Sequence, residues 1–167
     1  MSHVLALPGS IRRASYNRLL LAAGAGCAPA GMTVSLFEDL SSIPPFSEDL
    51  EADEVLPAAV RRLRSEVESA GGLVIATPEY NQSIPGVLKN AIDWLSRSEE
   101  VLAGKPVAVI GATAGRWGTR LAQAALRQVL HATGSLVMPG PAMYVPDAGR
   151  VFDSAGHLVD RPTREAL

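Results

Sequence analysis

Short, largely apolar runs alternate with longer amphipathic stretches along the chain. Five of the short runs are predicted to be strands: residues 4–7, 33–37, 72–76, 107–110 and 136–138. Four stretches between them are predicted to be helices: residues 17–28, 55–69, 86–97 and 117–133. In the second of these helices, Val55, Val60 and Leu63 fall on one apolar face. The run at 72–76 is apolar throughout, which is typical of a strand covered on both faces.

This alternation predicts a parallel sheet with helices on both faces, because parallel neighbours need a crossover connection. Five such strands fit a three-layer, flavodoxin-like α/β fold with strand order 2-1-3-4-5, and another three-layer α/β domain is the alternative. With 167 residues, the chain is expected to be one domain spanning 1–167. Residues 160–167 begin like a helix. We therefore expect a truncated final helix, or a sheet face covered in another way.

The amino-acid composition argues against several classes of protein. With 47% hydrophobic residues the chain can build a full core, and its net charge of −2 disfavours binding to nucleic acid or an anionic membrane. A single cysteine, Cys27, excludes an internal disulfide, and His3, His131 and His157 stand apart, so no metal site is expected. The sequence suggests neither a secretory signal nor a membrane span, so a cytoplasmic protein is expected.

Ligands of an open parallel sheet bind beyond the carboxyl ends of its strands, at the switch point. For the order 2-1-3-4-5 the relevant loops follow strands one, three and four, at residues 8–16, 77–85 and 111–118. These loops also have the most unusual composition of the chain. The candidate site is therefore expected there.

The first loop combines hydroxyl, guanidinium and amide groups directly before a helix. Ser10, Ser15 and Asn17 can donate or accept hydrogen bonds, and Arg12 can bind phosphate oxygens through its guanidinium. A helix N-terminus also attracts phosphate through its unpaired N–H groups. The alternative is simple capping by Ser15 or Asn17, with the arginines in water, and the loop alone leaves both open. The chain has no P-loop motif and no G-x-S-x-G motif.

The second loop is stiffened by Pro78 and Pro85 and offers Tyr80 as an aromatic plane beside the polar residues 81–83. A stacking surface with hydrogen-bonding groups suits a flat heteroaromatic ligand, although a turn with an incidental tyrosine is the simpler interpretation. The third loop, 111–118, has three glycines, which allow close approach of a ligand to the backbone.

These stretches together resemble the NADPH-dependent FMN reductase family, which includes bacterial quinone, chromate and azo-dye reductases. The resemblance covers about the first 150 residues, and residues 77–97 carry its most specific part. Residues 9–20, 43–51 and 118–127 also resemble family segments. The departure is Thr119, where many members have a second glycine, which puts the shape of the third loop in doubt.

The resemblance implies noncovalently bound FMN. Its phosphate would lie against Ser10, Arg12, Ser15, Tyr16 and Asn17, and its ring along Pro78, Glu79, Tyr80 and Asn81, with Thr113 and Gly115 on the other side. Family members are usually dimers or tetramers, so a homodimer or homotetramer is expected.

The implied activity is oxidation of NADPH or NADH by hydride transfer to N5 of FMN. Electrons then pass to a small acceptor, such as a quinone, free flavin, chromate, or an azo or nitro compound, in a ping-pong cycle. We nominate no catalytic side chain, because the cofactor supplies the chemistry, and we expect Glu79 and Asp93 to be structural. Arg13, Arg116 and Arg120 could meet the 2′-phosphate of NADPH or be solvated, so the choice between NADPH and NADH stays open.

Two other functions compete with this one. A flavodoxin-type electron carrier would lack nicotinamide chemistry, and the net charge of −2 argues against it, because such carriers are typically strongly acidic. A module that binds another phosphorylated ligand is the third possibility.

Overall fold

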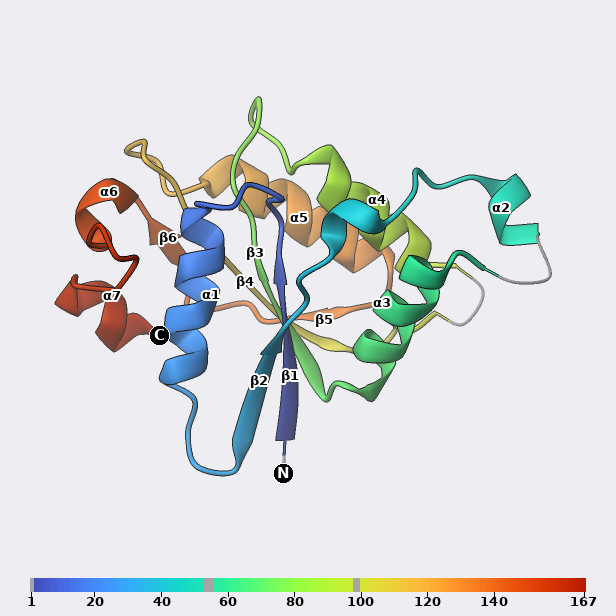
Figure 1. The fold of residues 1–167 in the computed structure, drawn as a ribbon, viewed down its shortest axis with the longest axis horizontal. Coiled ribbons are helices and arrows are strands. Elements are labelled where there is room, and N and C mark those ends of the chain that lie inside the picture. The colour runs from blue at the N-terminus through green and yellow to red at the C-terminus, as the bar shows by residue number, and fades with distance from the viewer. Residues whose placement is uncertain (1, 53–55, 98–99) are drawn as a thin grey trace.

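Figure 1 shows a computed structural model of the chain, which describes residues 2–52, 56–97 and 100–167. A parallel sheet of order β2-β1-β3-β4-β5 runs through its centre, which confirms the predicted fold and strand order. The strands on this path are β1 (Ser2–Pro8), β2 (Met32–Leu36), β3 (Gly72–Ala76), β4 (Pro106–Ala112) and β5 (Leu136–Val137).

The prediction of five strands was wrong by one, because a further short strand, β6 (Met143–Val145), completes the sheet. Both β5 and β6 pair in parallel with β4, β5 near its start and β6 at Ile110–Ala112. Between them lie Pro139 and Pro141, which have no N–H to donate to a sheet ladder. The prolines explain why the sequence pattern did not reveal the second segment.

The four predicted helices are confirmed, with shifted ends: α1 (Tyr16–Gly26), α3 (Ala58–Ser69), α4 (Gly86–Leu95) and α5 (Arg120–Ala132). Shorter helices also form: the 3-10 helix η1 (Leu40–Ser42), α2 (Glu48–Ala52), α6 (Ala148–Val151) and α7 (Arg161–Ala166). Helix α3 begins after Pro57, and Val55 lies outside the described residues. Helix α5 begins later than predicted because Gly118 and Thr119 adopt left-handed backbone, with φ of 61° and 63°.

The main core lies between the sheet and helices α3, α4 and α5. Leu5, Ile75 and Val109 point into it from the strands, where they meet Leu63 of α3 and Leu126 of α5 among others. Helix α1 packs on the opposite face, with α6 and α7 beyond it in Figure 1. The sheet is therefore covered by helices on both faces, as the alternating pattern predicts.

The helix predicted to begin near residue 160 is α7, which is capped by Asp160. The Asp160 carboxylate accepts hydrogen bonds from the Thr163 N–H (2.9 Å) and hydroxyl (2.7 Å), and these bonds lower the pKa of Asp160. After α7, Leu167 reaches α1, close to Gly24.

Candidate functional site

The loops that follow β1, β3 and β4 lie at the same end of the sheet, at the top of Figure 1. All the sequence-predicted site residues lie on these loops or in the first turn of α1. The structure thus places these residues at the carboxyl edge of the sheet. Their contact with a cofactor stays a prediction.

Asn17 ties the first and third loops together. Its side chain is 2% exposed and donates from Nδ2 to the Ala112 carbonyl, while its Oδ1 accepts from the Ala112 N–H, each at 2.9 Å. An amide carries two N–H donors, so one Nδ2 hydrogen is not needed for this pair. The first role of Asn17 is therefore to hold the start of α1 against the end of β4.

The first loop presents donors at the start of α1. Ser15 occupies the N-cap position but makes no side-chain capping bond, so no side chain of the cap satisfies the N–H groups of the first turn. The Ser10 hydroxyl accepts from the Arg12 N–H at 3.3 Å, and the Arg12 guanidinium carbon lies 5.6 Å from the Tyr16 ring centre. Gly9 packs so closely that an added Cβ would lie 2.9 Å from Leu88. The loop is suited to hold an anion.

A cavity of about 310 Å³ lies beside this loop. Ser10 and three arginines line it, Arg12, Arg13 and Arg18, of which Arg18 is paired with Glu38. The positive charge of the arginines that line this cavity suits a phosphate group.

The second loop contains a tight turn. Tyr80 and Ser83 exchange two backbone hydrogen bonds of 3.0 Å, and Asn81 and Gln82 between them have positive φ angles of 50° and 65°. Positive φ at both central residues is the pattern of a type I′ turn, which Asn favours. The turn exposes 52% of Tyr80 at the edge of the sheet, so the ring is available to a ligand.

Glu79 connects the second loop to α5. Its Oε2 accepts hydrogen bonds from the N–H groups of Leu121 (2.9 Å) and Ala122 (3.1 Å), in the first turn of that helix. A carboxylate there satisfies two unpaired donors and opposes the positive end of the helix dipole. Glu79 therefore acts as a helix cap supplied from another loop, in agreement with the structural role expected for it.

The third loop is anchored to β6 and α6. The Thr113 N–H donates to the Val145 carbonyl (3.0 Å), and the Thr113 carbonyl accepts from Ala148 (2.9 Å). The Gly115 carbonyl accepts from the Asp147 N–H at 3.1 Å. Thr113 and Gly115 thus have ordered positions against β6 and the start of α6, although β6 was missing from the prediction.

Gln123 is a residue that the sequence did not single out. It is fully buried, and its Nε2 donates to the Thr119 hydroxyl (3.1 Å) and the Met143 carbonyl (2.9 Å). Gly111 lies against the same group, since an added Cβ would fall 1.9 Å from the Thr119 hydroxyl. Glycine at 111 was visible in the sequence as part of a glycine-rich loop, but a lone glutamine in a helix gives no such signal.

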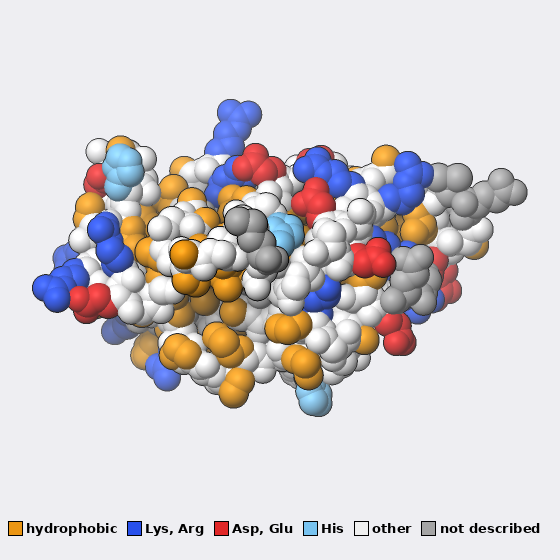
Figure 2. All heavy atoms as spheres, turned by 90° about the horizontal axis from the view of Figure 1, so that it is seen from below, with side chains coloured by type: hydrophobic (Ala, Val, Ile, Leu, Met, Phe, Trp, Pro, Cys, Tyr) orange, Lys and Arg blue, Asp and Glu red, His pale blue; other side chains and the backbone are white. Residues whose placement is uncertain are grey.

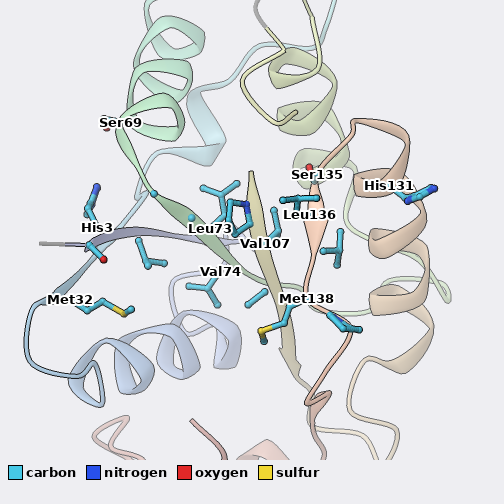
Figure 3. A pocket seen from close by; sticks show the side chains of 18 residues that line it. His3, Met32, Ser69, Leu73, Val74, Val107, His131, Ser135, Leu136 and Met138 are labelled. Carbon is cyan, nitrogen blue, oxygen red and sulfur yellow. The ribbon is translucent and has the colours of Figure 1, made fainter. Parts of the chain in front are cut away.

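A cavity much larger than the one beside the first loop lies at the opposite end of the sheet. It measures about 1160 Å³ and is lined by the first residues of the strands, including Val4, Leu73 and Val107. Figure 2 looks onto that end and shows hydrophobic side chains gathered near its middle, and Figure 3 places His3 and His131 on opposite sides of the cavity. His3 is hydrogen-bonded to the Ser35 hydroxyl at 2.8 Å. The lining is mostly apolar, and the described residues that form it include His3, His131 and three serines but no arginine or lysine, so the candidate site stays at the loops.

The structure also bears on metal binding and on membrane insertion. Within residues 2–52, 56–97 and 100–167, no three His, Cys, Asp or Glu side chains gather as a metal site would require. Over the same described ranges, no helix combines the length and apolar character needed to cross a membrane.

Comparisons with known proteins identify relatives. The model of a family described as NADPH-dependent FMN reductase matches residues 2–150. An NAD(P)H-dependent FMN reductase of Pseudomonas aeruginosa is 44% identical over 165 residues, which make up 98% of this chain and 88% of that protein. A quinone reductase of Escherichia coli K12 is 39% identical over 166 residues, with the same coverage of 98% and 88%.

A solved structure is also similar. The flavoenzyme NAD(P)H:(acceptor) oxidoreductase FerB from Paracoccus denitrificans is 34% identical and superposes with a TM-score of 0.88. The match covers 99% of this chain and 90% of that one. Sequence and fold thus agree on the same group of proteins.

The capping role of Glu79 predicts its effect on stability. Glu79→Ala removes the acceptor for two N–H groups and is expected to lower the free energy of unfolding by about 0.5–2 kcal/mol. Glu79→Gln keeps a side-chain oxygen and is expected to lose less. Urea denaturation followed by circular dichroism measures both, and equal stability of Glu79→Ala and the unchanged protein would contradict the capping role.

Proposed function

This chain belongs to the NADPH-dependent FMN reductase family, and on that basis we propose that its FMN lies across the three loops at the carboxyl edge of the sheet. Membership makes it an NAD(P)H-dependent flavoenzyme. The observation that carries the proposed site is the start of α1, which has no side-chain cap and lies beside Ser10 and Arg12. Unpaired N–H groups with an adjacent guanidinium are what a flavin phosphate requires.

The phosphate end of FMN would be held by Ser10, Arg12, Ser15 and the backbone N–H groups of Tyr16 and Asn17. Support comes from the free N-cap, the positively charged cavity and the close packing of Gly9, which leaves the loop little freedom. Asn17 contributes mainly by position, because Ala112 engages both ends of its amide. These residues fit the group that the family binds.

The ring of FMN would lie along Pro78, Glu79, Tyr80 and Asn81, with Thr113 and Gly115 facing it. The tight turn at residues 80–83 supports this, because it presents Tyr80 and backbone polar groups on a rigid surface. Glu79 supports the site indirectly, since its carboxylate fixes the second loop against α5. In this proposal the residues around the ring hold it in place, and none of them reacts with it.

Bound FMN supplies the redox chemistry, accepting hydride from NAD(P)H and passing electrons to an acceptor in a ping-pong cycle. The protein would bind and orient the cofactor: Arg12 would neutralise the charge of its phosphate, and Tyr80 would offer a face to its ring. Backbone N–H groups of the second loop would stabilise negative charge on the reduced ring, because their fixed positions need no rearrangement. We nominate no general acid or base.

The acceptor is proposed to be a quinone. Support comes from the quinone reductases among the relatives, including the enzyme of Escherichia coli K12 and a 2-hydroxy-1,4-benzoquinone reductase of a Burkholderia species that is 40% identical. Free flavin, chromate, azo and nitro compounds remain further acceptors to assay. From the resemblance to the family we also propose a cytoplasmic homodimer or homotetramer, which sedimentation equilibrium would test.

The function is tested by the purified protein itself. It is expected to be yellow, to release FMN rather than FAD on denaturation, and to bleach when NADPH is added without oxygen. Stoichiometric FAD would contradict the single phosphate loop. A yellow protein that NADPH does not bleach would indicate an electron carrier, and a colourless one that takes up no FMN would favour a module for another phosphorylated ligand.

Arg12→Ala tests the phosphate loop. Loss of a charge-assisted contact is expected to weaken FMN binding by about 1.5–3 kcal/mol, roughly ten- to a hundredfold. Flavin fluorescence titration measures the affinity. Arg61→Ala, which removes an exposed arginine of α3, is the control and should bind FMN normally. Unchanged affinity of Arg12→Ala with an intact circular dichroism spectrum would exclude Arg12 from the phosphate site.

Tyr80→Ala tests the ring site. An exposed aromatic that stacks on a ligand is worth about 0.5–1.5 kcal/mol beyond its burial, whereas truncating a core aromatic costs about 3–5 kcal/mol of stability. We therefore expect weaker FMN binding or slower NADPH oxidation with nearly unchanged melting of the apoprotein. Tyr80→Phe, which keeps the ring, should retain most of the affinity. A large fall in apoprotein melting temperature with normal turnover would make Tyr80 a packing residue.

A further inference from the structure

Two exposed arginines beside the candidate site each lie over an aromatic ring. The guanidinium carbon of Arg116 is 5.7 Å from the ring centre of Trp117, and that of Arg120 is 5.8 Å from the ring centre of Tyr144. Trp117 is 62% exposed and Tyr144 is 39% exposed. We call these four residues the arginine–aromatic patch. Trp and Tyr are enriched at binding surfaces, because each combines an apolar ring with a polar group.

The chain segments that carry the two halves of the patch are in contact. Gly118, between Trp117 and Arg120, packs on Tyr144 so closely that an added Cβ would lie 2.7 Å from the Tyr144 Cβ. Gln123 holds the same two segments together, because its buried Nε2 bonds both the Thr119 hydroxyl and the Met143 carbonyl. The patch is therefore a preformed surface, and a ligand that binds it loses little free energy to ordering.

The positive charge of the patch is not neutralised from within the chain. In the ranges that the structure describes, neither Arg116 nor Arg120 forms an ion pair. Of the neighbouring carboxylates, Glu79 is bonded to the backbone of α5, and Asp147 contributes one charge against two. Two guanidiniums thus stand ready for an external anion.

We propose that the arginine–aromatic patch binds the adenosine end of NADPH, with Arg116 and Arg120 on its 2′-phosphate and Trp117 against the adenine. This rests on the proposed function, which brings a nicotinamide dinucleotide to the neighbouring loops. A ring face beside two guanidiniums that form no ion pair suits an adenine next to a phosphate. NADH lacks the 2′-phosphate and leaves the arginines without a partner, so the patch selects NADPH.

The test uses two small nucleotides that differ at the 2′ position, adenosine 2′,5′-bisphosphate and adenosine 5′-monophosphate. Calorimetric titration of the purified full chain should show the bisphosphate binding at least tenfold more tightly. Arg116→Ala and Arg120→Ala should each lower this preference by roughly tenfold or more, as loss of a charge-assisted contact does. Trp117→Ala should weaken both nucleotides by a similar factor. The ratio of kcat/KM for NADPH over NADH should fall in parallel with the two arginine variants.

The control is Arg61→Ala, which removes an exposed arginine of α3 outside the patch and should leave both ratios unchanged. Equal affinity of the unchanged protein for the two nucleotides would overturn the proposal, as would a preference that survives both arginine variants. Dissociation of an oligomer by the double arginine variant, seen in sedimentation, would instead make the patch a subunit contact and also overturn it. Nucleotide binding needs no flavin, so a failure of the FMN site shows separately in the released-flavin assay.

Discussion

The candidate site depends on one buried amide. Asn17 exchanges two hydrogen bonds with the backbone of Ala112, 95 residues away, at the point where β4 ends. A strand end buried without partners would leave an N–H and a carbonyl unsatisfied, at a cost of about 1–3 kcal/mol for each group. Asn17 satisfies both and, in doing so, sets the start of α1 against the third loop. The first loop therefore has a defined position relative to the rest of the candidate site.

Two further polar side chains also link segments that lie far apart in the sequence. Glu79 joins the second loop to the first turn of α5, and Gln123 joins the residue before α5 to β6. In each case a side chain from one segment satisfies groups of another. Such cross-links matter in an enzyme whose cofactor carries the chemistry, because the protein's contribution is to hold that cofactor and its partners in place.

At this edge of the sheet, neighbouring segments provide different groups for binding a ligand. The start of α1 offers uncapped N–H groups and Arg12, the turn at residues 80–83 offers Tyr80, and the third loop leads to the arginine–aromatic patch. The much larger cavity at the opposite end has a mostly apolar lining. The chemistry of the lining, rather than the size of the hollow, distinguishes a site for charged ligands.

The sequence by itself determined the alternation of elements, the strand order and the three loops that carry the candidate site. These follow from local signals, such as the apolar run at 72–76 and the prolines around Tyr80, and from the rule that parallel strands expose their carboxyl ends at one edge. The expected structural role of Glu79 also agreed with the structure, but its partners could not be read from the sequence.

Only the tertiary structure decided those partners, the split of the last sheet position into β5 and β6, and the late start of α5. Glu79 meets Leu121 42 residues away, and Gln123 meets Met143, because sheet pairing brings their segments together. Thr119 takes a left-handed conformation that its residue type disfavours, at a place where Gln123 binds its hydroxyl. Periodicity is a local property of the chain, whereas these features depend on atoms that folding alone makes neighbours.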